Sequence, residues 1–174
     1  MTSQVATFHL ANGGMSRYER FSHFHNNFLG EILSEEDQER LDAEFSMLVE
    51  DGPWVTGALD LIATYCHRIP LHIASATPAD ELLRIVSRLG VRPFFQEVGG
   101  VPQPKGEILQ QIIIAGDYDP ERLLMVGDAL SDFEGTLEVG ATFLGRVDKD
   151  SINPFPKSVQ TVEALNQLAA CLYI

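Results

Sequence analysis

The sequence predicts an α/β domain with a parallel sheet, preceded by a small unit that contains only helices. After about residue 54, short apolar strand-like segments alternate with helical segments, and this alternation is typical of parallel sheets covered by helices. Before that position only helical patterns are found. We therefore expect a helical subdomain over residues 1–53 and an α/β core over residues 54–174.

Composition and charge restrict the classes of function. Of the 174 residues, 45% are hydrophobic, which is enough for an ordinary core. The formal net charge of -13 argues against binding to nucleic acid or to an anionic membrane surface, because both would repel the chain. No apolar run approaches the roughly 20 residues that span a bilayer, and the first residues lack the basic segment of a signal peptide. We expect a cytoplasmic protein that binds a small molecule, and the sequence leaves its oligomeric state open.

Helices are expected throughout the first 53 residues. Ser34, followed three residues later by Asp37, is a start that resembles a capping box. Ser16 is predicted to cap the preceding helix and Gly30 to end it. The expected helices are residues 4–14, 16–30 and 34–52.

Strands and helices alternate in the rest of the chain. Thr77 and Pro78 are predicted to be the N-cap and first residue of a helix that Gly90 ends. The expected strands are residues 70–75, 122–127 and 141–145, with 94–100 as a strand or a loop, and the expected helices are 56–66, 78–90, 106–116, 131–140 and 162–172.

Residues able to bind phosphate and a metal ion lie at the ends of these strands. Ser75 ends one strand, Asp128 ends another, and Lys105 stands at the start of the helix between them. Open parallel sheets bind ligands beyond the carboxyl ends of their strands. Asp128 can ligate Mg²⁺, and Asp132, one helical turn later, could hold a metal-bound water or orient Lys105. Each residue alone also fits a structural role, as a turn residue, a helix cap or a surface lysine.

Three segments resemble motifs of the haloacid dehalogenase (HAD) superfamily hydrolases with a small helical cap, the group that contains phosphoglycolate phosphatase. "LHIASATPADELLRIVSRLG" resembles the second motif, whose hydroxyl residue falls on Ser75. "PKGEIL" resembles the third, whose lysine falls on Lys105. "LLMVGDALSDFEGTLEVGATFLG" resembles the fourth, whose two acids fall on Asp128 and Asp132.

The resemblance implies a HAD-like Rossmannoid parallel sheet with an N-terminal α-helical cap. It implies a phosphomonoester phosphatase that depends on Mg²⁺ and acts on a small phosphorylated metabolite of the phosphoglycolate or sugar phosphate class. The implied site residues are Ser75, Lys105 and Asp132 in catalysis, Asp128 and Asp132 as metal ligands, and Ser75, Ala76, Lys105 and Arg17 in substrate binding.

Arg17 lies in the helical unit that closes over the substrate in capped relatives. Its guanidinium could clamp a carboxylate or a second phosphate of the substrate. In the alternative interpretation, Tyr18 and Phe21 are core residues and Arg17 is solvated.

The first motif of this family is not identified in the chain. In the family it is a D-x-D triplet after an apolar strand, and its first Asp is the nucleophile. The first Asp here is Asp37, within a charged helix. The family's first strand lies between those matching residues 70–75 and 122–127, so we expect the sheet to lack its central strand.

Three explanations of the missing motif stay open. The chain is a truncated product of a longer reading frame, or a non-catalytic relative, or its missing strand is supplied by a rearranged segment or by a partner polypeptide. We expect weak or absent turnover from these 174 residues, so whether the chain is itself an enzyme is left open. The alternative function is a binding or regulatory module for phosphate and Mg²⁺. A dehalogenase, a mutase and a receiver-like domain are lesser alternatives.

Overall fold

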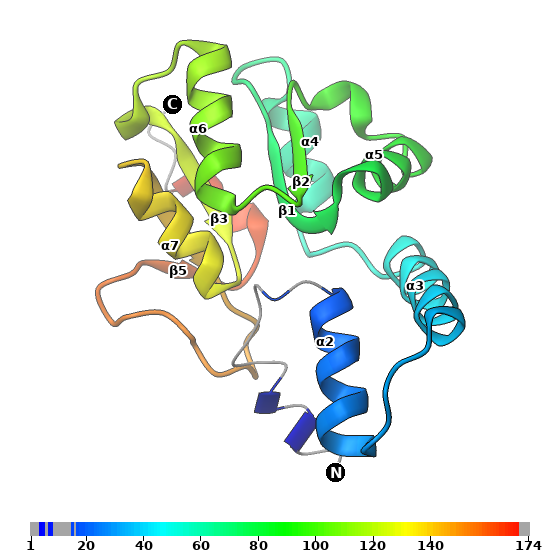
Figure 1. Cartoon of the computed structure of the whole chain (residues 1–174). Helices are drawn as coiled ribbons and strands as arrows, with labels where there is room; N and C mark the ends of the chain where they lie inside the picture. Colours follow the sequence, from blue (N-terminus) through cyan, green and yellow to red (C-terminus); the bar gives the residue numbers. More distant parts are fainter. Residues whose placement is uncertain (1–3, 6, 9–14, 16, 171–174) are drawn as a thin grey trace. The chain divides into compact units, whose positions relative to one another are not determined.

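The computed structural model describes residues 4–5, 7–8, 15 and 17–170, which form two compact units (Figure 1). The first unit is Met1–Gly52 and the second is Pro53–Ile174. Each unit is described by itself below. The role of the first unit as a cap stays a prediction.

The first unit contains helices only in its described residues. The Asp37 N–H donates to Ser34 Oγ at 3.1 Å, so the predicted cap of the last helix is confirmed. Gly30, with a φ of 71°, ends the preceding helical segment as expected. The predicted cap Ser16 and most of the helix expected over residues 4–14 lie outside the described residues. The helices are α2 (Arg17–Phe24), the π-helix η1 (His25–Leu29) and α3 (Glu35–Glu50).

The second unit alternates parallel strands with helices, so the predicted α/β class is confirmed. The strands form two separate sheets, one with the order β1-β2 and one with the order β3-β4-β5. The division lies between β1 and β3, where the sequence predicts a missing central strand. The strands are β1 (Ile73–Pro78), β2 (Val98–Val101), β3 (Leu124–Gly127), β4 (Thr142–Arg146) and β5 (Thr161–Val162), and the helices are α4 (Ala58–Tyr65), α5 (Ala79–Arg88), η2 (Arg92–Phe94), α6 (Lys105–Gly116), η3 (Pro120–Arg122), α7 (Leu130–Glu138) and η4 (Leu165–Ala170).

Helices cover both faces of the two sheets. On one face, Ile112 of α6 belongs to a core cluster that includes Ala74 of β1 and Met125 of β3. On the other face, α4 contributes Ile62 to the cluster of β1 and β2, and Leu61 to the cluster of β3, β4 and β5. Alternate side chains of a strand point to opposite faces, which explains how one strand packs on two helices. Both α4 and α6 therefore contact both sheets.

Two predicted element boundaries are wrong. Thr77 does not cap α5, because β1 continues to Pro78 and the helix begins at Ala79. Pro78 has extended backbone angles, φ -52° and ψ 136°, which place it before the helix. In the described part of the helix expected over residues 162–172, the structure has the end of a short strand, β5, followed by the 3-10 helix η4, and residues 171–172 lie outside the described residues. Pairing of β5 with β4 overrides the local helical pattern.

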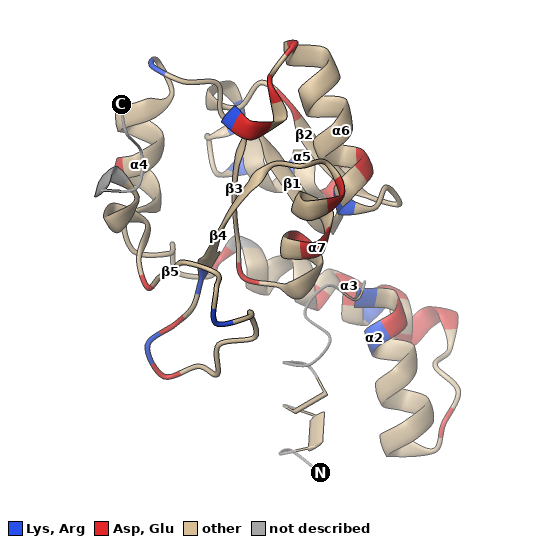
Figure 2. Cartoon of the chain, turned by 90° about the vertical axis from the view of Figure 1, so that its left-hand side faces the viewer, with Lys and Arg blue, Asp and Glu red and all other residues tan. Residues whose placement is uncertain are grey.

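Charge is distributed over many elements. Acidic residues occur in the first turns of α3, α5, α6 and α7 (Figure 2), and the loop after β4 mixes acidic and basic residues. None of the described helices is long and apolar enough to cross a membrane.

Candidate functional site

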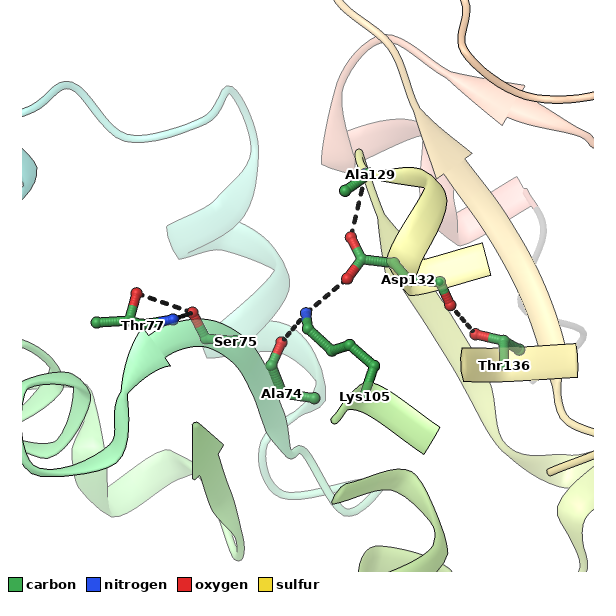
Figure 3. A network of polar contacts seen from close by, with 7 residues as sticks. All are labelled: Ala74, Ser75, Thr77, Lys105, Ala129, Asp132 and Thr136. Atoms are coloured by element: carbon green, nitrogen blue, oxygen red, sulfur yellow. Dashed lines mark hydrogen bonds and ion pairs between the residues drawn. The ribbon is translucent and has the colours of Figure 1, made fainter. Parts of the chain in front are cut away.

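Lys105 is the centre of a polar network between β1 and the segment that follows β3 (Figure 3). Its Nζ donates to Asp132 Oδ1 at 2.5 Å and to the Ala74 carbonyl of β1 at 2.7 Å. The side chains of Lys105 and Asp132 are only 12% and 7% exposed, respectively. Two residues that lie 27 positions apart in the sequence are thus held together in a largely buried ion pair.

Asp132 is held in place from several sides. Its Oδ2 accepts the N–H of Ala129 at 3.1 Å, and its backbone carbonyl accepts the hydroxyl of the fully buried Thr136 at 2.6 Å. Both carboxylate oxygens therefore have a donor inside the protein. This arrangement favours the predicted role of Asp132 in orienting Lys105 over direct ligation of a metal ion.

Two glycines permit this close packing. A Cβ on Gly127, at the end of β3, would lie 2.5 Å from Asp132 Oδ2. A Cβ on Gly135 would lie 2.7 Å from the Cβ of Lys105 and 2.8 Å from the backbone nitrogen of Gly106. These distances are shorter than van der Waals contact, so a side chain at either position would separate α7 from β3 or from the start of α6.

Ser75 lies beside the network, as the residue after Ala74 in β1. Its Oγ accepts the N–H of Thr77 at 3.1 Å and donates to the Thr77 hydroxyl at 3.0 Å. Ser75 and Ala76 are half-buried, and both belong to β1, which begins and ends three residues later than predicted. A phosphate bound here would compete with Thr77 for the Ser75 hydroxyl, because a hydroxyl has one proton to donate.

Asp128 is exposed and follows directly after the last residue of β3. A single exposed carboxylate fits Mg²⁺, because this ion commonly takes one or two carboxylates and completes its shell with waters and phosphate oxygens. No group of three or more His, Cys, Asp and Glu side chains that could hold a metal occurs among the described residues. The role of Asp128 as a ligand of Mg²⁺ stays a prediction.

Arg17 belongs to the first unit and packs within it. Its side chain is 6% exposed, its Nη1 donates to Ser46 Oγ at 3.2 Å, and its guanidinium lies 4.7 Å from the centre of the Phe45 ring. The expectation of a solvated Arg17 is therefore wrong, and Tyr18, expected in the core, is 36% exposed. The role of Arg17 in substrate binding stays a prediction.

Residues 148–150, with the sequence D-K-D, have D-x-D spacing and follow β4. No D-x-D triplet was expected after an apolar strand, and this segment does not meet that expectation. Asp148 accepts a hydrogen bond from Arg146, and the loop lies beyond the end of β4, separated from β1 by β3. A second D-x-D triplet, residues 117–119, lies in the segment between α6 and β3, and no D-x-D triplet directly follows β1 or β3 in the sequence.

His72 precedes β1 and is half-buried. Its Nε2 lies 3.3 Å from the Tyr118 hydroxyl, which in turn donates to Gln96 Oε1 at 3.1 Å. Burial lowers the pKa of His72, and the nearby Glu97 carboxylate partly opposes this effect. We therefore expect His72 to be neutral at pH 7.

The fold of the chain is that of the HAD-superfamily hydrolases, as the resemblance of its motifs predicts. The crystal structure of the HAD hydrolase YfnB of Bacillus subtilis, bound to magnesium, is similar with a TM-score of 0.73, 21% identity, and coverage of 99% of this chain and 82% of that one. A protein from Thermotoga maritima described as a β-phosphoglucomutase has a TM-score of 0.67 and 24% identity, covering 91% and 80% of the two chains. A predicted phosphoglycolate phosphatase from Haemophilus somnus has a TM-score of 0.72 and 14% identity, covering 88% and 75%.

These likenesses establish the fold alone, because all three identities are below 25%. The sequence matches no model of a protein family and no curated protein. The activity of this chain must therefore be argued from its own residues.

Proposed function

We propose that the second unit binds Mg²⁺ and the phosphate group of a small phosphorylated metabolite, of the phosphoglycolate or sugar phosphate class, between β1 and the carboxyl end of β3. The observation that carries the proposal is the ion pair of Lys105 with Asp132, at 2.5 Å, together with the bond from Lys105 to the carbonyl of Ala74, the residue before Ser75. This set of groups fits the phosphate site of a phosphomonoester phosphatase.

Each residue has a distinct role in the proposed site. The Lys105 ammonium offsets negative charge on the phosphate oxygens, where electrostatic stabilisation of phosphoryl transfer acts. The Ser75 hydroxyl and the Ala76 N–H donate hydrogen bonds to the phosphate. Asp132 keeps the Lys105 ammonium in place. Asp128 supplies a carboxylate to Mg²⁺, which neutralises phosphate charge when it is bound.

Hydrolysis also requires a group that attacks phosphorus. The D-x-D triplet that supplies this group in the resembled family has no counterpart after β1 or β3, because the two D-x-D triplets of the sequence lie before β3 and after β4. We therefore expect these 174 residues to bind phosphate with little or no turnover. This same observation favours the second candidate function, a binding or regulatory module for phosphate and Mg²⁺.

Calorimetric titration of the purified chain with Mg²⁺, with and without inorganic phosphate, tests the proposed site. We expect phosphate to bind in the presence of Mg²⁺, Asp128→Asn to abolish Mg²⁺ binding, and Ser75→Ala to weaken phosphate binding. Glu134→Gln is the matched control, because Glu134 is an exposed acid on α7. Absence of Mg²⁺ and phosphate binding by the folded wild-type chain would refute the proposal.

Hydrolysis of an aryl phosphate, measured with Mg²⁺ and with EDTA, separates the two candidate functions. Absence of turnover together with binding supports the binding module. Metal-dependent turnover that Asp128→Asn abolishes would support a phosphatase and would show that the chain contains an attacking group. An Asp148→Asn variant then tests whether the D-K-D segment provides that group.

A further inference from the structure

Arg146 lies at the carboxyl edge of the sheet formed by β3, β4 and β5, next to the end of the strand that Asp128 follows. β3 and β4 are parallel, and Gly127 of β3 is paired with Gly145 of β4. Asp128 and Arg146 each follow directly after one residue of this pair, and neighbouring strands of a sheet lie about 4.8 Å apart. Arg146 also pairs with Val162 of β5. Its backbone is therefore held on a rigid element at the edge where Asp128 lies.

The guanidinium of Arg146 is only partly paired. The side chain is 19% exposed, and its Nη2 donates to a carboxylate oxygen of Asp148. Its Nε is buried and has no hydrogen-bond acceptor among the residues that the structure describes. Nε and Nη2 share one side of a guanidinium, and a carboxylate that faces this side accepts from both nitrogens. A buried donor without an acceptor is unfavourable, so the arrangement favours a carboxylate that reaches both.

Asp148 is a partner that a ligand can replace. It belongs to the loop after β4, and its side chain is 60% exposed. An ion pair with a partner this exposed contributes little stability, because water solvates the carboxylate as well. Release of the Asp148 side chain into solvent therefore costs little, and it leaves the Nη2 of Arg146 open beside the unpaired Nε.

We propose that Arg146 forms a subsite for a carboxylate of the ligand, and that the Asp148 side chain occupies this subsite in the ligand-free chain. The inference rests on the proposed function, because the phosphate of the same ligand would bind beside Lys105 and Ser75. It narrows the ligand to phosphorylated metabolites whose carboxylate and phosphate are joined by a short carbon chain. Sugar phosphates without a second anionic group would gain no contact with Arg146.

The charge of this edge makes Arg146 necessary for such selectivity. The chain has a formal net charge of -13, and Asp128 and Asp148 follow the ends of two neighbouring strands. A second negative group on the ligand would be repelled here unless a cation faces it. Removal of the Arg146 charge should therefore remove any preference for a carboxylate.

Calorimetric titration of the full chain with Mg²⁺ present, comparing phosphoglycerate with glycerol phosphate, tests the subsite. The two probes, each phosphorylated on a terminal hydroxyl, differ only in that the carboxylate of the first is a hydroxymethyl group in the second. We expect the wild type to bind phosphoglycerate about tenfold more tightly, as a charge-assisted pair predicts. Asp148→Asn, which removes the competing charge, should increase this preference.

Arg146→Gln should remove the preference and leave the affinity for inorganic phosphate nearly unchanged. Arg122→Gln is the matched control, because it removes the same charge from an exposed arginine that precedes β3, at the opposite end of that strand. The NMR signal of the Arg146 Nε–H, assigned with the Arg146→Gln variant, gives a second readout in the wild type. This signal should shift with phosphoglycerate and change little with glycerol phosphate.

Equal affinity of the wild type for the two probes, or a preference that persists in Arg146→Gln, would overturn the inference. An Arg146 signal that responds equally to both probes, or loss of inorganic phosphate binding in folded Arg146→Gln, would overturn it as well. In these cases, binding of inorganic phosphate by the wild type still supports the proposed function. Absence of that binding refutes the proposed function and this inference together, so the two failures are distinguishable.

Discussion

Asp132→Asn tests the central ion pair, because asparagine keeps the shape of the side chain and removes its charge. The Lys105 ammonium would then be largely buried, at 12% exposure, beside a neutral group. Removing one partner of a buried ion pair costs about 3–5 kcal/mol of unfolding free energy. We expect a loss of about 3 kcal/mol, at the lower end of that range, because the Ala74 carbonyl still accepts a bond from Lys105. The melting temperature would fall by about 6–12 °C in a chain of this size.

Urea denaturation followed by far-UV circular dichroism measures this loss. Glu134→Gln, which neutralises an exposed acid on the same helix, is expected to leave the urea midpoint nearly unchanged. A double-mutant cycle is completed by the single variant Lys105→Met and by its combination with Asp132→Asn, because the double variant leaves no charge unpaired. We expect a coupling energy of about 1–3 kcal/mol between the two residues.

A loss below about 1 kcal/mol for Asp132→Asn would match an exposed ion pair and would refute the reasoning from burial. A coupling energy near zero would refute the direct interaction of Lys105 with Asp132. Either result would also remove the observation on which the proposed phosphate site depends.

Two further predictions concern His72 and Gly135. Because burial lowers the pKa of His72 in the folded state, the unfolded state binds the proton of this residue more tightly. The stability of the chain should therefore fall as the pH drops below the ordinary histidine pKa of about 6.5. Melting temperatures of the wild type and of His72→Gln, measured between about pH 7.5 and 5.5, should diverge, and parallel curves would contradict this prediction. Gly135→Ala should destabilise the chain by about 1–3 kcal/mol, because its Cβ would lie 2.7 Å from that of Lys105. Helix propensity alone predicts a gain of about 1 kcal/mol for this change, so the sign of the shift in urea midpoint decides between the two effects.

Local sequence patterns identified elements whose signals are strong and short-range. The Ser34 cap, the end of a helix at Gly30 and the placement of Lys105 at the start of α6 follow from such patterns. The end of β1 and the short strand β5 were missed. Both depend on pairing with strands distant in sequence, and no local pattern reports that pairing.

The sequence also predicted which residues form the candidate site, but not the contacts between them. The spacing of Asp128 and Asp132 indicated that they lie one helical turn apart, and the sequence left open whether Asp132 holds a metal-bound water or orients Lys105. The structure shows both of its carboxylate oxygens bonded inside the protein, to Lys105 and to the Ala129 N–H. It also places Arg17 against Phe45 and Ser46 within the first unit, where the sequence predicted a substrate clamp or a solvated side chain.

By itself the sequence determined the α/β class and the order of most elements, because hydrophobic periodicity is a local property. The tertiary structure alone decided that the strands form two sheets and that Lys105 joins Ala74 to Asp132. These features depend on contacts between residues about 30 positions apart, which form only when α4 and α6 pack on both sheets.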